Sequence, residues 1–364
     1  MAGYEVRAVT FHAGALPASG QELESSLEEL AERALEAVDS ASSATGLRPT
    51  YVRVALPGVR LEDASRVAKV AERLGSDVLL NAGAWPASAD LEKLVDVPRS
   101  GAYLSILLVE RTWEEARRAS AFIHSLSSSD PALATRVAIN VTGEAHLITP
   151  YYPLASAVLG RDIVTAALTY PSYLAEAYSR EGLQGLRKAI AEAGSRAWAV
   201  VEEVSRLTGF EAGGVDLSVS PWMEDSSLGL AELVSGVRMP RPGFALGVRA
   251  INEAISAASG SIKTVGFNEL MLPLAEDSKL KARASEGDVT ARYLAMLSGV
   301  CVAGLDMVPV PASVNDVAGL FLDVAAYALA KGRALGVRLI PVEGAEPGDR
   351  VDLGRFGDAP VIPI

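Results

Sequence analysis

Polar side chains that could take part in chemistry stand at the ends of several apolar segments of this sequence. His12, Asn140 and His146 each lie at or soon after a segment that reads as a strand. In parallel α/β folds, binding and catalytic sites form from the loops that follow the carboxyl ends of strands. A histidine titrates near neutral pH, so His12 and His146 are candidates for a general base. Asn140 is a candidate for contacting a substrate.

The densest group of such side chains comprises Asp216, Ser218, Ser220, Glu224, Asp225 and Ser226. Alternation puts Asp216, Ser218 and Ser220 on one face of an otherwise apolar strand, where polar groups need partners. One interpretation is a substrate-binding pocket wall, in which Asp216 and Glu224 hold a hard cation such as Mg²⁺ or substrate hydroxyls. The other is that the second half of the group only begins a helix, with Asp225 or Ser226 as its N-cap.

Further candidates for the same pocket come from the C-terminal third of the chain. Asn268 follows an apolar segment and is expected to contact the substrate. Glu276 and Asp277 are adjacent carboxylates, which suit a substrate or cation site or acid–base work, but which also suit a solvated loop. Cys301 is the only cysteine. It is a candidate nucleophile or radical site, and its valine neighbours equally suit a small buried hydrophobe.

Composition restricts the class of protein. The chain has 364 residues, 49% of them hydrophobic, and a formal net charge of −12. An acidic surplus argues against binding to nucleic acid or to an anionic membrane, and we expect part of it to line one pocket. A single cysteine makes no internal disulfide, and neither a leader peptide nor a long apolar run is visible. We therefore expect a cytoplasmic protein without a membrane span.

Two further observations concern growth temperature and cofactors. Among 33 basic residues only seven are Lys, and the chain has five Asn and two Gln. This depletion is typical of thermophilic proteins and equally of GC-rich genomes. The sequence contains no phosphate loop of ATP-binding proteins, no glycine fingerprint for NAD, and no zinc-like spacing of His and Cys. The cofactor stays unknown, with a divalent cation such as Mg²⁺ as the one candidate.

Strand-like and helix-like segments alternate along the chain. Strands are expected at residues 5–11, 51–56, 77–81, 103–109, 136–141, 214–220, 261–267 and 337–341. Residues 151–208 read as a helical middle segment. Alternation of strands and helices predicts an α/β fold with a mostly parallel sheet, either a closed barrel or a large doubly wound sheet.

Several short motifs in the C-terminal half occur together in one order. They are Gly-Gly-Val-Asp-Leu-Ser-Val-Ser-Pro at 213–221, Ser-Gly-Val-Cys-Val-Ala-Gly-Leu-Asp-Met at 298–307, Arg-Leu-Ile-Pro at 338–341, Gly-Asp-Arg-Val-Asp at 348–352 and Ala-Pro-Val-Ile-Pro at 359–363. In this the chain resembles the domain-of-unknown-function family 711, also known as uncharacterised protein family 0210. The likeness is strongest from about residue 200 to 364 and extends to 149–153.

The resemblance carries expectations about the fold. The family is similar in fold to pyruvate formate-lyase and anaerobic ribonucleotide reductase, ten-stranded α/β barrels with a catalytic cysteine on an inner loop. It thus implies one barrel domain over residues 1–364, with half-barrels at about 1–145 and 210–364 around the helical segment at 151–208. The resemblance draws attention to Cys301 as a catalytic residue. The C-terminal motif of the radical enzymes is missing, so a glycyl radical is not expected.

Three functions follow as hypotheses. The first is an enzyme of unknown reaction that acts on a small polar metabolite at the strand ends. The second is a non-catalytic metabolite sensor, because members of the resembled family are often encoded beside small ACT-domain proteins that bind amino acids. The third is a homodimeric scaffold. In each case we expect a homo-oligomer, with a dimer as the simplest form.

Overall fold

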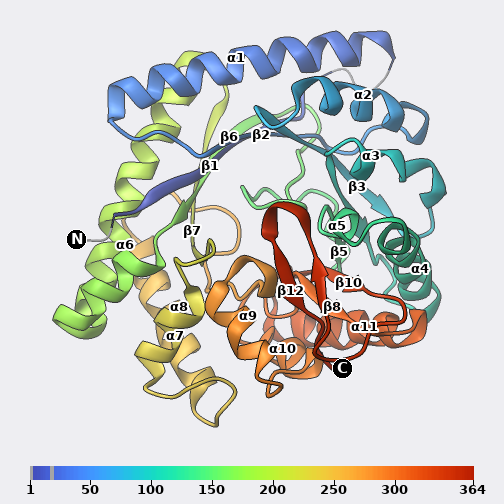
Figure 1. The fold of residues 1–364 in the computed structure, drawn as a ribbon. Helices are drawn as coiled ribbons and strands as arrows, with labels where there is room; N and C mark the ends of the chain where they lie inside the picture. The colour runs from blue at the N-terminus through green and yellow to red at the C-terminus, as the bar shows by residue number, and fades with distance from the viewer. Residues whose placement is uncertain (1–2, 17–19) are drawn as a thin grey trace.

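The computed structural model of the chain describes residues 3–16 and 20–364. Within these residues one strongly curved sheet has eight strands in the order β7-β6-β1-β2-β3-β4-β5-β9 (Figure 1). Its strands are β1 (Glu5–Ala13), β2 (Tyr51–Ala55), β3 (Val78–Pro86), β4 (Tyr103–Leu107), β5 (Val137–Asn140), β6 (Asp162–Thr169), β7 (Glu211–Ser220) and β9 (Gly336–Val337). Outside this sheet, β8 (Val308–Val310) pairs with β10 (Leu339–Pro341), and β11 (Arg350–Asp352) forms a hairpin with β12 (Asp358–Pro360).

The curved sheet is mostly parallel. Strands β1 to β5 pair in parallel in sequence order, and β6 pairs in parallel with β7. The two exceptions are β6 against β1 and β9 against β5, which are antiparallel. The expectation of an α/β fold with a mostly parallel sheet is therefore confirmed.

Helices cover the convex side of the sheet, as Figure 1 shows for the blue α1 and the lime α6. The helices are α1 (Gln21–Thr45), α2 (Ala64–Leu74), α3 (Asp96–Arg99), α4 (Trp113–Ser129), α5 (Pro131–Ala134), α6 (Pro171–Thr208), α7 (Ser227–Ser235), α8 (Phe244–Ser259), α9 (Ser278–Ser285), α10 (Ala291–Leu297) and α11 (Val314–Lys331). In the part of the chain that the structure describes, none of these helices is long and apolar enough to cross a membrane.

Alternation along β1 separates the two faces of the sheet. Val9 and Phe11 belong to the large apolar core beneath the outer helices. Thr10 and His12 point to the concave face, where they bond to main-chain carbonyls of residues 147–157. This internal segment runs through the inside of the curved sheet and is buried over much of its length. Successive side chains of a strand face opposite sides of the sheet, so the apolar residues of β1 reach the core and the polar ones reach the concave face.

The structure corrects the expected helical middle at 151–208. Residues Asp162–Thr169 form strand β6, and only Pro171–Thr208 is helical. The alanines of this stretch favour a helix, but Ile163, Val164 and Thr165 are β-branched and pair with β1. The sequence pattern was ambiguous here, and pairing with the neighbouring strand decided the structure.

A ten-stranded barrel of the pyruvate formate-lyase type is not confirmed. Beyond β7 the ladder continues through isolated parallel bridges at Thr264, Leu270 and Ala303, instead of through a further continuous strand. The strand expected at 261–267 is accordingly irregular apart from its bridge. Likewise, the strand expected at 337–341 is divided at Arg338 between β9 and β10. The division of the chain into two half-barrels stays a prediction.

Candidate functional site

A cavity lies between the concave face of the sheet, the internal segment and the C-terminal elements. It offers about 60 Å³ to the centres of water-sized molecules, which corresponds to a few waters or one small metabolite. Six charged side chains line it, namely Arg7, Arg53, Arg338, Arg355, Glu276 and Asp306. We call it the arginine cavity. Its uncharged lining includes Tyr103, Tyr151, Tyr152, Phe267 and Ser220.

Each arginine reaches the cavity from a different element. A register shift between Val6 and Ala8 in β1 marks a bulge, and Arg7 within it lines the cavity. Bulges commonly re-aim a side chain in this way. Arg53 occupies the middle of β2 and pairs across the sheet with Thr10. Arg338 lies at the break between β9 and β10, and Arg355 lies at the turn of the β11–β12 hairpin.

Two of the arginines are neutralised by the two carboxylates. Arg338 forms a two-point contact with Asp306 at 2.5 and 2.7 Å and a further contact with Glu276 at 3.0 Å. Arg7 binds the other Glu276 oxygen at 2.6 Å. Burial opposes the charge of the Glu276 carboxyl, but Arg7 and Arg338 outweigh burial and hold its pKa below the usual value. Burial likewise opposes the charge of Arg338, whose pKa the two carboxylates nevertheless raise.

The other two arginines have no carboxylate within ion-pair distance among the described residues. Arg53 is 4% exposed, donates from Nη1 to the Pro150 carbonyl at 2.7 Å, and has an Nε–H without an acceptor in the described chain. Burial, with the nearby charge of Arg7, lowers the pKa of Arg53 to about 10, so it stays charged at neutral pH. Arg355 donates to the Tyr103 hydroxyl at 3.0 Å. The cavity lining therefore has two more positive than negative charges, one on the buried Arg53 and one on the exposed Arg355.

Two acidic residues, Glu276 and Asp306, line the cavity, but arginines outnumber them, so the lining is not acidic overall. The chain as a whole has a net charge of −12, but around the cavity four arginines face two carboxylates. The acidic surplus belongs elsewhere. Low dielectric around buried groups makes such a local imbalance matter far more than the same imbalance at the surface.

Two of the sequence-predicted residues line the cavity, Ser220 and Glu276. Glu276 and Asp277 are adjacent, and both are buried instead of lying in a solvated loop. Glu276 lines the cavity, whereas Asp277 is the N-cap of α9. Asp277 accepts hydrogen bonds from Lys279 and Leu280 at the start of α9, and it binds the Ser226 hydroxyl at 2.7 Å. Ser226 is the N-cap of α7, as the second interpretation predicts.

His12 and Asn140 are buried polar residues with local partners. The His12 Nδ1–H donates to the Ser156 carbonyl at 2.6 Å, and its Nε2 accepts from the Thr165 hydroxyl at 2.9 Å. Burial lowers the pKa of His12 to about 4, although the bond to Ser156 opposes that shift. Asn140 bonds to the main chain of Glu144 and to Thr142. Neither residue lines the arginine cavity.

Asp216 holds a loop in place. Its carboxylate accepts from the backbone N–H groups of Ser218, Phe267 and Asn268 at 2.8–3.0 Å, and from the Ser218 hydroxyl at 2.6 Å. Asn268, which has a positive φ of 55°, accepts in turn from the backbone of Leu217. A cation at Asp216 would need lone pairs that these donors already occupy. Among the described residues no group of three or more His, Cys, Asp or Glu gathers as a metal site.

The three remaining candidates lie in different surroundings. Cys301 is fully buried outside the cavity lining, and burial raises the pKa of its thiol to about 12. The two residues that follow it, Val302 and Ala303, do line the cavity. These observations favour packing over nucleophilic attack for Cys301, because the thiolate is the nucleophile. Glu224 and His146 are exposed.

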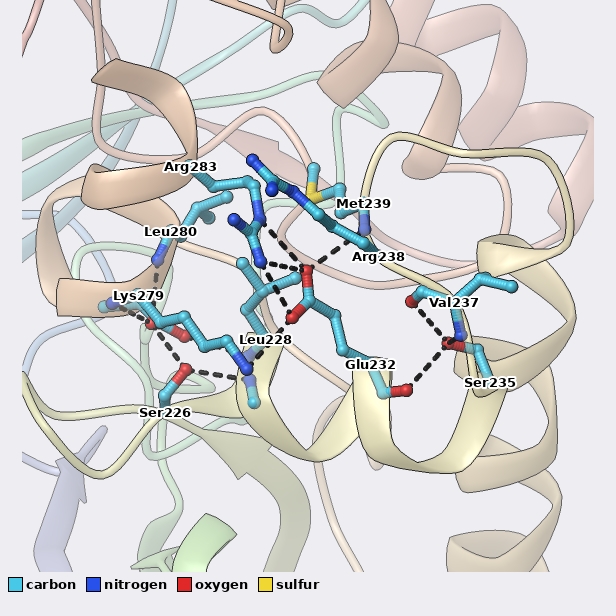
Figure 2. Close-up of polar contacts among 12 residues, drawn as sticks. Ser226, Leu228, Glu232, Ser235, Val237, Arg238, Met239, Lys279, Leu280 and Arg283 are labelled. Carbon is cyan, nitrogen blue, oxygen red and sulfur yellow. Dashed lines mark hydrogen bonds and ion pairs between the residues drawn. The ribbon is translucent and has the colours of Figure 1, made fainter. Parts of the chain in front are cut away.

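A second charged cluster, between α7 and α9, is fully paired (Figure 2). Glu232 on α7 binds Lys279 at 2.9 Å and Arg283 at 3.0 Å, and it accepts from the Met239 backbone at 3.1 Å. Arg238 pairs with Glu286 beside them. Each charged side chain here lies within ion-pair distance of one of opposite sign, so this cluster joins two helices.

Sequence reasoning missed most of the cavity, although a signal was present. Arg7 and Arg53 each interrupt an apolar strand between valine-rich neighbours, as Val-Arg-Ala-Val and Val-Arg-Val-Ala, and Arg338 follows Val337 in the same manner. A charge in the middle of a buried strand requires a partner or a ligand. Arg355 carries no such signal, because its exposed loop resembles any other turn.

Comparison with known proteins finds a family and several relatives that this chain is similar to. Residues 114–354 match the model of a family described as "Uncharacterised ACR (DUF711)". A UPF0210 protein of Pyrobaculum arsenaticum is 30% identical over 96% of this chain and 88% of the relative. A UPF0210 protein of Pyrobaculum aerophilum is 30% identical over 99% and 90%. One of Methanopyrus kandleri is 34% identical over a shorter stretch, 45% of this chain and 38% of the relative.

Proposed function

The chain belongs to the uncharacterised DUF711 family, also named UPF0210, and because the family name supplies no activity we propose one from the site: the protein binds a small anionic metabolite in the arginine cavity. The observation that carries this proposal is the pair of guanidinium groups, Arg53 and Arg355, that lack a carboxylate partner within the described residues. Arg53 is buried and Arg355 is exposed, so the charge of Arg53 is the one that costs folding free energy unless a ligand meets it.

The chemistry of the lining suits a carboxylate or a phosphate. Arginine presents several N–H donors in a planar fork that matches both groups. Arg53 uses one donor on the Pro150 carbonyl, so its remaining N–H groups are available to an anion. Tyrosine hydroxyls in the lining add neutral donors, and the aromatic rings enclose the apolar part of a metabolite.

A thermal-shift screen tests this proposal. Small carboxylates and phosphate esters are added to the wild-type protein and to Arg53→Met, with the neutral amide or alcohol of each compound as its control. We expect at least one anion to raise the Tm of the wild type, its neutral analogue to leave Tm unchanged, and Arg53→Met to lose most of the shift. A wild type that no anion stabilises would contradict the proposal.

An enzyme that acts on the same anion is the second candidate function. It is favoured by Tyr151, which lines the cavity and whose hydroxyl reaches the Ser218 carbonyl only at 3.4 Å. Burial raises the pKa of Tyr151, so the phenol keeps its proton and can donate it to a developing negative charge. Product analysis of each stabilising compound separates the two functions: an anion recovered intact indicates a binding or sensor protein, and a consumed anion indicates an enzyme.

A further inference from the structure

We propose that the ligand of the arginine cavity carries two negative charges, and that Arg355, on the C-terminal hairpin, meets the second charge and closes the cavity over it. This inference rests on the proposed function and specifies its ligand class. The ligand is a short dicarboxylate or a phosphate monoester. The hairpin β11–β12 projects into the space inside the curved sheet, as its red ribbon shows in Figure 1.

The count of charges gives the first part of the argument. Glu276 and Asp306 balance two of the four arginines, because each carboxylate contacts Arg338 and Glu276 also contacts Arg7. Arg53 and Arg355 remain, and no described acidic side chain lies within ion-pair distance of either. A ligand with one charge can meet the buried Arg53 but leaves the charge of the exposed Arg355, which also lines the cavity, to water alone. A dianion makes the occupied cavity neutral.

The position of the two free guanidinium groups gives the second part. The central carbon of Arg53 lies 5.5 Å from the centre of the Tyr51 ring, and that of Arg355 lies 5.6 Å from the same point. They are therefore no further apart than about twice that distance. A dicarboxylate with a short carbon chain can reach both, and so can one phosphate group if they are closer together. Arg53 also lies over the Tyr152 ring at 4.9 Å.

The anchoring of the hairpin turn gives the third part. Phe356 stacks edge-on against Trp222 with ring centres 5.9 Å apart, and Lys281 donates to its carbonyl. Next to it, Arg355 reaches across to the Tyr103 hydroxyl on β4. Aromatic rings and one hydroxyl hold this guanidinium, so most of its N–H donors stay available. Phe356 fixes the turn while Arg355 faces the ligand.

Matched anions that differ by one charge test this inference by titration at pH 8. The dianions are succinate, glutarate and methyl phosphate, and their singly charged partners are succinamate, glutaramate and dimethyl phosphate. Each is titrated into the wild type, Arg355→Gln and Arg350→Gln. Arg350 lies on the same hairpin, is exposed and does not line the cavity, so its substitution removes the same charge without touching the site.

The expected result is that at least one dianion binds the wild type about tenfold or more tightly than its singly charged partner. Arg355→Gln is expected to remove this preference by weakening only the dianion, whereas Arg350→Gln keeps it. Equal binding of both charge types to the wild type, or a preference that survives in Arg355→Gln, would overturn the inference and leave the proposed function standing. If no anion of either kind binds the wild type, the proposed function fails as well.

Discussion

The inside of the curved sheet contains two regions that treat buried polar groups in opposite ways. In the first, which we call the filled face, Thr10, His12 and Asn81 bond to main-chain carbonyls of residues 147–157. In the second, the arginine cavity, the Nε–H groups of Arg7 and Arg53 have no acceptor among the described residues. Both regions are lined by polar side chains that break the apolar pattern of a strand, so the sequence alone does not distinguish them.

The difference separates two roles of a buried polar residue, stabilising the fold and binding a ligand. Where each donor meets an acceptor, the residues stabilise one arrangement of the chain and leave nothing for a ligand. Where donors exceed acceptors, the fold bears a cost that a ligand can remove. Stability should therefore depend on the filled face and on the paired half of the cavity, and binding on the unpaired arginines.

The largest effect is expected at the paired half of the cavity. Arg338→Met leaves Asp306 and part of Glu276 as uncompensated buried charges, so the free energy of unfolding should fall by about 3–5 kcal/mol in a urea titration. The double variant Arg338→Met with Asp306→Leu removes both members of the two-point pair and should recover part of that loss. If Arg338→Met alone were as stable as the wild type, the pair of Arg338 and Asp306 would not be buried as described.

The next effect is a pH dependence from the filled face. His12 has a pKa of about 4 in the fold against 6.5 in the unfolded chain, so between these values only the unfolded chain binds the proton. Its contribution to stability is complete above pH 6.5 and is lost as the pH falls toward 4, by about 3 kcal/mol in total. Gln does not titrate, so the free energies of unfolding of the wild type and of His12→Gln, measured against pH, should differ in their slope between pH 4 and 6.5. Parallel curves from pH 4 to 7 would contradict the buried, neutral His12.

At the unpaired half of the cavity, replacing an arginine should raise the stability of the ligand-free protein instead of lowering it. Arg53→Met removes a buried charge without a carboxylate partner, so the ligand-free protein should become more stable by about 1–3 kcal/mol in urea. Arg7→Met, which breaks the ion pair with Glu276, is the matched control and should lower stability. Destabilisation by Arg53→Met comparable to that by Arg7→Met would remove the distinction between paired and unpaired arginines.

The smallest effect is expected at Cys301. Cys301→Ser places a hydroxyl where a buried thiol packs, so stability should fall by about 1–2 kcal/mol while anion affinity stays unchanged. Cys301→Ala serves as the control for the lost volume. Rapid labelling of the native protein by iodoacetamide, or loss of anion binding in Cys301→Ser, would contradict this and indicate that Cys301 takes part in the site.

Much of the fold could be predicted from periodicity, and the exceptions have local causes. Strands β1, β2 and β7 lie close to where their patterns place them. Strand β6 was missed because its alanines favour a helix and only pairing with β1 makes it a strand. The internal segment at 147–157 was expected to be helical from residue 151, but it forms neither helix nor strand, since its carbonyls bond to side chains on the inner face of the sheet.

The candidate site could be predicted only in part. Placement after strands selected His12 and Glu276, and alternation along a strand selected Asp216 and Ser220. Of these, Ser220 and Glu276 line the cavity, whereas His12 and Asp216 bond to main-chain atoms distant in sequence. The donors and acceptors around a buried side chain can be counted only when the fold is known, because they come from distant parts of the sequence. A dimer, an ACT-domain partner and growth at high temperature stay predictions.

Isothermal titration calorimetry of wild type and Arg53→Met with one anion tests the central claim most directly. The anion is the one that gives the largest thermal shift with the wild type. The arginine cavity predicts saturable binding of one anion per chain to the wild type, and at least tenfold weaker binding to an Arg53→Met protein that is no less stable. Equal affinity for the two proteins would contradict it, because the anion would then bind somewhere other than the buried guanidinium of Arg53.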